Sequence, residues 1–259
     1  MYSIPVALTP ALPSELLTYI LSFDARPVTL MVCQPRDRFL QSLLQSTPTI
    51  SHIPPASPEG SDANAHDTAT ENPFLRHDLL VPTIQQVLTS RNIDVVFVQS
   101  LSHLRAYLAV FHSSKQKDTR YLDDDRCLIK EQSLLMVYGM LELHRDTTEW
   151  SAQGLSQTLA NIVHTGYHNH LDIMLVEKTR QQHNSEDSEA EELSAREIRK
   201  LRRQEALHVW DEEVPVLSGG SSKKVVEGGW SGRKVEIGRI LKRWFRFEAG
   251  LWHPLEKTR

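Results

Sequence analysis

The chain has 259 residues, a formal charge of −4 at pH 7 and 40% hydrophobic residues, which is ordinary usage for a globular protein long enough to bury a core. Its 11 glycines exclude a collagen-like chain, and two cysteines, Cys33 and Cys127, are too few for a disulfide framework, so we expect a reducing compartment. No apolar run approaches the roughly 18 residues that span a membrane, and no signal peptide is evident.

Short apolar runs alternate with amphipathic segments along the chain. Continuous apolar runs typical of strands buried on both faces occur at Val28–Cys33, Asp94–Val98, Ser133–Val137 and Leu171–Val176. Helical spacing is found at Glu15–Leu21 with Ser14 as the expected N-cap, and at Thr83–Ser90, Ser102–Phe111 and Ser151–His168. Because strands and helices alternate, the pattern predicts an α/β fold with a mostly parallel sheet covered by helices on both faces.

Three segments are poor material for a core. Residues 47–73 are rich in Pro, Ser, Asp and Asn and predict a long or disordered loop. Residues 181–206 form a charged insertion whose second half has good helix formers, with Glu192 and Arg196 spaced as an i,i+4 pair. Residues 218–229 are rich in Gly and Ser and predict a further loop.

The order and spacing of the elements from Leu79 to Glu177 resemble the core of RecA-type ATPases, and more narrowly that of eukaryotic recombinase paralogues. The stretch from Arg91 to Leu104, RNIDVVFVQSLSHL, is similar to the strand and helix that precede the Walker B strand in that family. Ser133–Arg145 stands where those proteins carry Walker B. The Val214–Leu217 segment and the Trp230–Phe247 tail are similar to fungal paralogues of the Shu-complex kind.

The resemblance implies a single RecA-like domain over residues 1–259 with a degenerate P-loop NTPase core. A P-loop needs G-x-x-x-x-G-K-[ST], but the corresponding place after Val6–Leu8 reads TPALPS, without glycine or lysine. Tyr138 stands where the metal-binding carboxylate of Walker B belongs, and a phenol is a poor ligand for Mg²⁺. We therefore expect no hydrolysis, no cofactor and no metal at a degenerate nucleotide site made of Thr9, Pro13, Ser14 and Tyr138.

A basic segment occupies residues 230–259. On a helix over Glu236–Phe247, four apolar side chains would share an arc of roughly 100° and four cations a similar arc on the other side, next to aromatic rings. This pattern suits phosphate contacts and base stacking, and the candidate DNA-binding residues are Arg233, Lys234, Arg239, Lys242, Arg243 and Arg246. Two alternatives stay open: a docked helix with a solvated basic face, and a strand over Trp244–Phe247.

Three further constellations favour ordinary structural roles. His164, His168 and His170 have a spacing that zinc-binding histidines can have, but no neighbouring ligand completes the set, so a helix end and turn is the better interpretation. The acidic triplet Asp123–Asp125 is most simply a solvated loop. The charged insertion 181–206 is either a partner-binding or DNA-gating element or a solvated surface helix.

The resemblance implies a non-catalytic, nuclear subunit that assists homologous-recombination DNA repair. Its expected partners are another RecA-like paralogue or a SWIM-domain protein, the recombinase filament, and DNA, with no membrane. The alternatives are an inactive RecA-like accessory subunit of an Elongator-type tRNA-modification complex, and a noncanonical nucleotide hydrolase.

Overall fold

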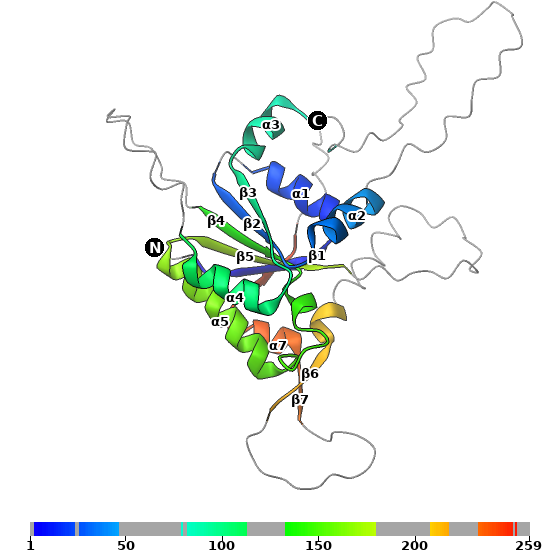
Figure 1. Ribbon diagram of the computed structural model, residues 1–259, viewed down its shortest axis with the longest axis vertical. Helices are drawn as coiled ribbons and strands as arrows, with labels where there is room; N and C mark the ends of the chain where they lie inside the picture. Colours follow the sequence, from blue (N-terminus) through cyan, green and yellow to red (C-terminus); the bar gives the residue numbers. More distant parts are fainter. Residues whose placement is uncertain are drawn as a thin grey trace, which may run out of the picture.

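A six-stranded parallel sheet organises the computed structural model, which describes residues 3–23, 26–46, 79, 82–112, 133–179, 208–217, 233–250 and 252 (Figure 1). The strand order is β3-β2-β4-β5-β1-β8, and every neighbouring pair is parallel. The bounds are β1 Val6–Ala11, β2 Val28–Val32, β3 Ile93–Phe97, β4 Leu134–Tyr138, β5 Asp172–Lys178 and β8 Arg246–Glu248. A short antiparallel pair, β6 Glu213–Pro215 and β7 Lys234–Glu236, lies apart from the sheet.

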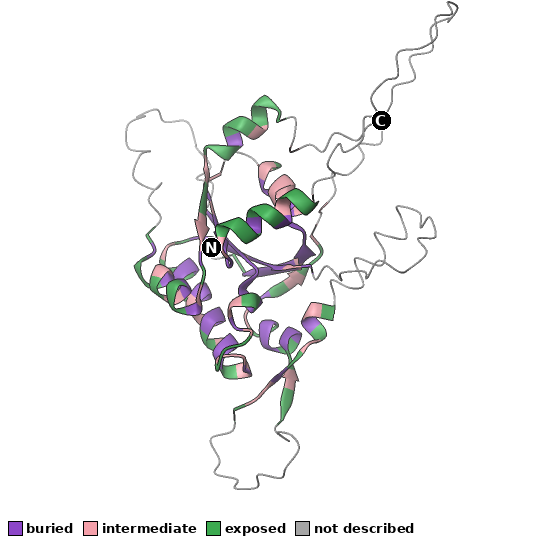
Figure 2. Cartoon of the chain, turned by 45° about the vertical axis from the view of Figure 1, so that its right-hand side comes forward, coloured by how far each residue is buried: buried purple, intermediate pink, exposed green. Residues whose placement is uncertain are grey.

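Helices cover both faces of the sheet, as expected for buried parallel strands. One face packs against α1 Pro13–Leu21 and α2 Arg36–Ser46, and the other packs against α4 Leu101–Val110, α5 Ala152–His168 and α7 Ile237–Leu241 (Figure 1). Colouring by burial shows the sheet as the buried layer between them (Figure 2). Successive β4 side chains alternate between the two cores, with Leu135 and Val137 in one and Leu134, Met136 and Tyr138 in the other.

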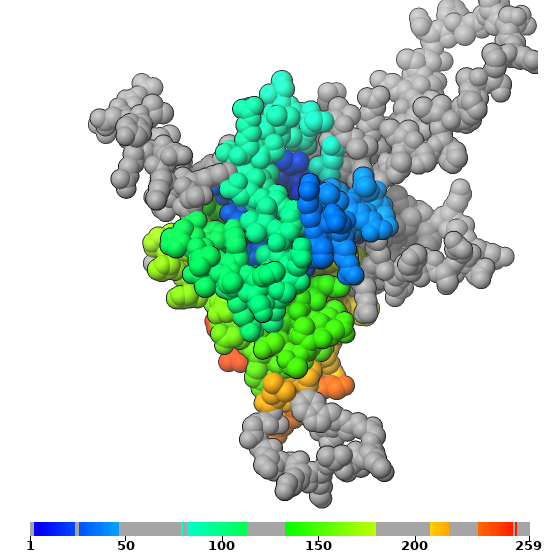
Figure 3. Space-filling model, in the orientation of Figure 1, coloured from blue at the N-terminus to red at the C-terminus, as the bar shows by residue number. Residues whose placement is uncertain are grey.

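The remaining helix, α3 Ile84–Ser90, contacts α1 and precedes the edge strand β3. The space-filling view shows the continuous segment from α3 through β3 to α4 along one face, with α2 next to it (cyan to green and blue in Figure 3). The predicted α/β class with a parallel sheet and helices on both faces is confirmed, and all four predicted strands are present within two residues of their expected ends. The expectation that Asp94–Val98 is buried on both faces is wrong, because β3 is an edge strand in which Asp94 and Val95 are exposed.

The first strand and helix differ from expectation in where they meet. The strand β1 runs through Thr9 and Pro10 to Ala11, and α1 begins at Pro13 with Leu12 as its N-cap, so the expected cap at Ser14 is wrong. Pro10 has no N–H for a ladder, and the pairing of β1 with β5 shifts register between Leu8 and Ala11. A bulge is the usual way for a central strand to hold a proline.

The predicted helix over Glu236–Phe247 is wrong beyond Leu241. A turn follows α7, and the chain then enters β8, which pairs in parallel with β1. The strand alternative for Trp244–Phe247 is thus confirmed from Arg246 onward. The expected apolar face is buried all the same, because Ile237, Ile240 and Leu241 pack into the core, with Trp244 half-buried against it.

Several predictions fall on residues that the structure does not describe. These are the loop at 47–73, the acidic triplet at 123–125, Cys127, the charged insertion at 181–206, and the loop at 218–229. The helix α2 was not predicted, although Phe39, Leu40, Leu43 and Leu44 recur at helical spacing in its sequence RDRFLQSLLQS. None of the helices in the described part of the chain is long and apolar enough to cross a membrane.

The start of α5 tolerates no side chain at Gly154. Ser151 caps the helix by accepting the Gly154 N–H at 3.1 Å, and a Cβ on Gly154 would lie 2.2 Å from the backbone oxygen of Glu149. We expect Gly154→Ala to lower the free energy of unfolding by about 1–3 kcal/mol, as overpacking against backbone does. Urea unfolding measures this, with the exposed Gln157→Ala as the control. A Gly154→Ala chain as stable as the wild type would contradict the packing at this helix start.

Candidate functional site

Tyr138 lies at the carboxyl ends of the strands, in the predicted nucleotide site. It is the last residue of β4 and is 1% exposed. Its hydroxyl donates to the backbone oxygen of Ala11 at the end of β1, 3.0 Å away, and its ring packs edge-on against Phe39 of α2. Burial raises the pKa of Tyr138, so the hydroxyl stays protonated and keeps donating. The tyrosine therefore links β4 to β1 across the intervening strand β5.

The amino end of α1 holds a carboxylate of the chain itself. Glu15 accepts the Leu12 N–H at 2.9 Å, and Pro13, at the first helical position, has no N–H to offer. Ser14 is buried, and its hydroxyl points to the backbone oxygen of Ser46 at 3.4 Å. A helix amino terminus is a common phosphate site because its N–H groups are free. Here the N–H at the cap is already used.

Thr9 anchors the C-terminal segment. Its Oγ1 accepts the Gly250 N–H at 3.0 Å and the indole N–H of Trp252 at 2.9 Å. The Trp252 ring in turn packs edge-on against Tyr19 of α1. All four residues of the predicted degenerate nucleotide site are thus engaged in contacts that hold β1, α1, β4 and the C-terminal segment together.

Glu177 is a buried carboxylate that the sequence reasoning missed. It lies in β5 and is 3% exposed, and it accepts the Leu141 N–H at 3.2 Å. Leu141 belongs to the short 3₁₀ helix Met140–Leu143, which begins after Gly139 in the left-handed region at φ 75°. Burial raises the pKa of Glu177 to about 8, while the Leu141 N–H acts in the opposite direction. An acid directly after the apolar run 171–176 was the available indication.

An ion pair next to Glu177 joins two distant parts of the chain. The Arg145 guanidinium donates to Glu212 twice, at 2.8 Å and 2.5 Å, and lies 4.8 Å from the centre of the Trp150 ring. A pocket of about 690 Å³ opens here, beyond the carboxyl ends of β4 and β5, and it is lined by Leu141, Glu142, Arg145, Glu177, Lys178, Thr179, His208, Val209, Asp211 and Glu212. Its four acids and two long cations make it poorly suited to a triphosphate.

The four cations predicted to share one helix face, Arg239, Lys242, Arg243 and Arg246, do not all lie on a helix. Arg239 and Arg243 line the same groove, whereas Lys234 lies 3.9 Å from Glu213 across the β6–β7 pair, and Arg246 pairs with Glu248 within β8. Arg233 and Lys242 are exposed. The predicted continuous basic face is not formed, because α7 ends at Leu241 and Arg246 belongs to a strand.

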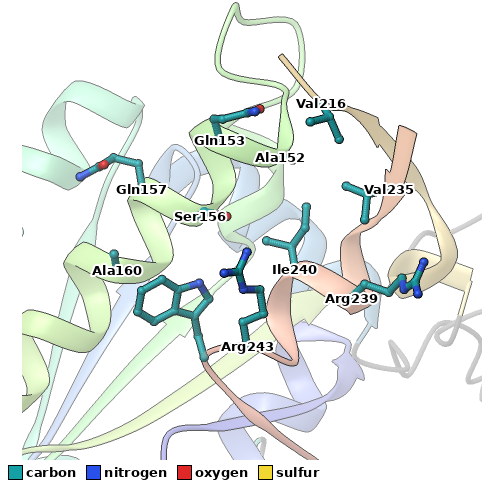
Figure 4. A pocket seen from close by; sticks show the side chains of 11 residues that line it. Ala152, Gln153, Ser156, Gln157, Ala160, Val216, Val235, Arg239, Ile240 and Arg243 are labelled. Atoms are coloured by element: carbon teal, nitrogen blue, oxygen red, sulfur yellow. The ribbon is translucent and has the colours of Figure 1, made fainter. Parts of the chain in front are cut away.

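A groove between α5 and α7 brings together part of the basic segment (Figure 4). We call it the α5–α7 groove. It has a volume of about 720 Å³ and is lined by Ala152, Gln153, Ser156, Gln157, Ala160, Val216, Val235, Arg239, Ile240, Arg243 and Trp244. Arg243 points into the groove toward Ser156, and Arg239 lies at its outer side below Val235 (Figure 4). Its lining carries two arginines and no acid.

The histidine pattern forms a helix end and turn, as interpreted from the sequence. The rings of His164 and His168 stack on the last turns of α5 with centroids 6.1 Å apart, and His170 follows in the left-handed region at φ 54°. Within the described ranges, no group of three or more His, Cys, Asp or Glu side chains is arranged to hold a metal ion.

Comparison with known protein families finds no match, and comparison with curated proteins finds none either. Among solved structures, the chain is similar to a DnaB-like replicative helicase, described together with its interactions with primase. The two are 13% identical, with a TM-score of 0.35 over 74% of this chain and 43% of the helicase chain. This chain therefore spans less than half of the helicase's length.

The raised pKa of Glu177 predicts a pH-dependent stability. Between the ordinary glutamate value of 4.5 and about 8, the folded chain holds a proton that the unfolded chain has lost, so the free energy of unfolding falls as the pH rises through this window. Glu177→Gln keeps an oxygen for the Leu141 N–H and removes the titration. We expect its thermal midpoint to exceed that of the wild type at pH 8.5 and to approach it at pH 4.5, with the exposed Glu142→Gln as the control. If the thermal midpoints of Glu177→Gln and wild type change with pH in the same way, the raised pKa of Glu177 is contradicted.

Proposed function

We propose that this chain is a non-catalytic, RecA-like subunit that assists homologous-recombination DNA repair in the nucleus. It acts through contacts with DNA and with protein partners, namely another RecA-like paralogue or a SWIM-domain protein together with the recombinase filament. The observation that carries the non-catalytic part is the Tyr138 hydroxyl on the Ala11 carbonyl, 3.0 Å apart. This hydrogen bond occupies polar groups at the carboxyl ends of the strands, where parallel α/β folds usually bind their ligands.

Two further features support a binding role without hydrolysis. The Glu15 carboxylate at the amino end of α1 would repel a phosphate there, and Pro13 offers no N–H to it. The neighbouring pocket around Glu177 carries more acids than bases, which also disfavours a nucleotide. This edge would serve as a scaffold, since its polar groups already stabilise β1, α1 and β4.

DNA contact is assigned to the basic residues that follow β7. From Ile237 to Phe247 the chain carries four arginines or lysines and no acid. Arg239, Lys242 and Arg243 are exposed and make no ion pair with any acid in the described ranges. Cations without acidic partners are the ones available for phosphates.

The first expected outcome concerns ATP. The purified chain should release phosphate from ATP no faster than a buffer blank, because residues 9–14 contain neither the glycines nor the lysine that hold phosphates. Tyr138→Asp should gain no activity for the same reason, with Tyr138→Phe as the control for loss of the Ala11 contact. Steady ATP turnover that follows the folded chain through a sizing column would favour the noncanonical hydrolase instead.

The second expected outcome concerns partners. Isolation of the full chain from its own cells under mild salt, followed by mass spectrometry, should recover recombination proteins, with a RecA-like or SWIM-domain subunit among the stoichiometric ones. Recovery of Elongator subunits in their place would assign the chain to tRNA modification. A tagged unrelated α/β protein of the same cell serves as the background control.

A further inference from the structure

Three features of the α5–α7 groove favour a bound anion. Arg239 and Arg243 supply two charges, and the α5 wall supplies no opposing one, since residues 152–168 contain no Asp or Glu. The lining residues of α5 begin at its first turn, Ala152 and Gln153, where the helix dipole is positive. An anion in this groove therefore meets attraction from both walls.

The wall opposite α5 carries apolar side chains and an aromatic ring beside the two arginines. Val216, Val235 and Ile240 line it together with Trp244, which is half-buried and packs against the core. The indole N–H of Trp244 has no hydrogen-bond acceptor among the described residues. A ligand that satisfies this groove thus needs negative charges and flat apolar surface at the same time.

The two glutamines that line the groove are hydrogen-bonded within the chain. The Gln153 amide donates to the backbone oxygen of Leu217 at 2.8 Å and accepts its N–H at 2.9 Å. Gln157 donates to Asn161 at 3.3 Å. Amides held in this way have little capacity left to read the edge of a base, so recognition in the groove does not depend on sequence.

We propose that the α5–α7 groove is a sequence-tolerant binding site for single-stranded DNA. Phosphates contact Arg239 and Arg243, and a base stacks in the apolar part against Trp244. A duplex presents phosphates but keeps its base faces stacked on one another, so it leaves the apolar wall without a partner. This inference depends on the proposed DNA contact and adds to it the form of the DNA and the residues that distinguish it.

The test is fluorescence anisotropy of the full chain with a labelled 20-nucleotide oligothymidine and with a 20-base-pair duplex, at several salt concentrations. The single strand should bind at least tenfold more tightly. Arg239→Ala with Arg243→Ala should reduce the slope of log K against log salt by about 1.4, since each phosphate contact on a single strand contributes about 0.7. The matched control is Arg36→Ala with Arg38→Ala, two exposed cations of α2 on the other face of the sheet, whose loss should leave single-strand affinity within about twofold.

Stacking is tested separately from charge. Trp244→Leu keeps apolar bulk against the core and removes the ring, so it should weaken oligothymidine binding at least about fivefold without changing the salt slope. Circular dichroism melting checks that each variant is folded. If Trp244→Leu unfolds, the variant with both Arg239→Ala and Arg243→Ala still tests the groove, because these two side chains are exposed.

Three results would overturn the inference. Equal affinity for duplex and single strand, or groove variants that bind like wild type while the control pair loses affinity, would exclude the groove and leave the proposed DNA contact standing. A polyglutamate peptide that displaces oligothymidine and loses affinity with the same two arginines would assign the groove to an acidic protein segment. No binding of either DNA by the folded chain or its isolated complex would overturn the inference and the DNA contact together.

Discussion

The hydrogen bond from the Tyr138 hydroxyl to the Ala11 carbonyl determines how this fold can be used. In a parallel sheet covered on both faces, loops at the carboxyl ends of the strands are the usual place for a ligand. Tyr138 and Glu15 fill two parts of that place with groups of the chain itself, and Thr9 fixes the C-terminal segment against it. These contacts stabilise the edge and occupy groups that a ligand there would need.

Acidic and basic side chains gather at different places on the molecule. The pocket beyond β4 and β5 gathers Glu142, Glu177, Asp211 and Glu212, while the α5–α7 groove on the helical layer has two arginines and an α5 wall without acids. A chain with a net charge of −4 can therefore attract an anion locally while repelling it at the sheet edge. The ion pair between Arg145 and Glu212 neutralises part of the acidic region from within.

The sequence was sufficient for elements whose burial is decided locally. Continuous apolar runs identified β2 to β5, and the stripe with its Ser151 cap identified α5. The sequence was insufficient where the structure of a segment depends on residues far away in the chain. The spacing after Glu236 fits a helix, but the open side of β1 offers a ladder that β8 completes. Likewise, Arg145 and Glu212 are 67 positions apart, and no local pattern relates them.

The pairing of β1 with β8 has a consequence for synthesis on the ribosome. Val6–Leu8 emerges some 240 residues before its partner Arg246–Glu248. At about 5–20 residues per second, the outer side of β1 waits on the order of ten seconds or more for its neighbour. During that interval an unpaired strand next to a proline bulge is exposed to other chains. Another chain could add a strand to this open edge until β8 pairs with it, so β8 protects β1 once it is in place.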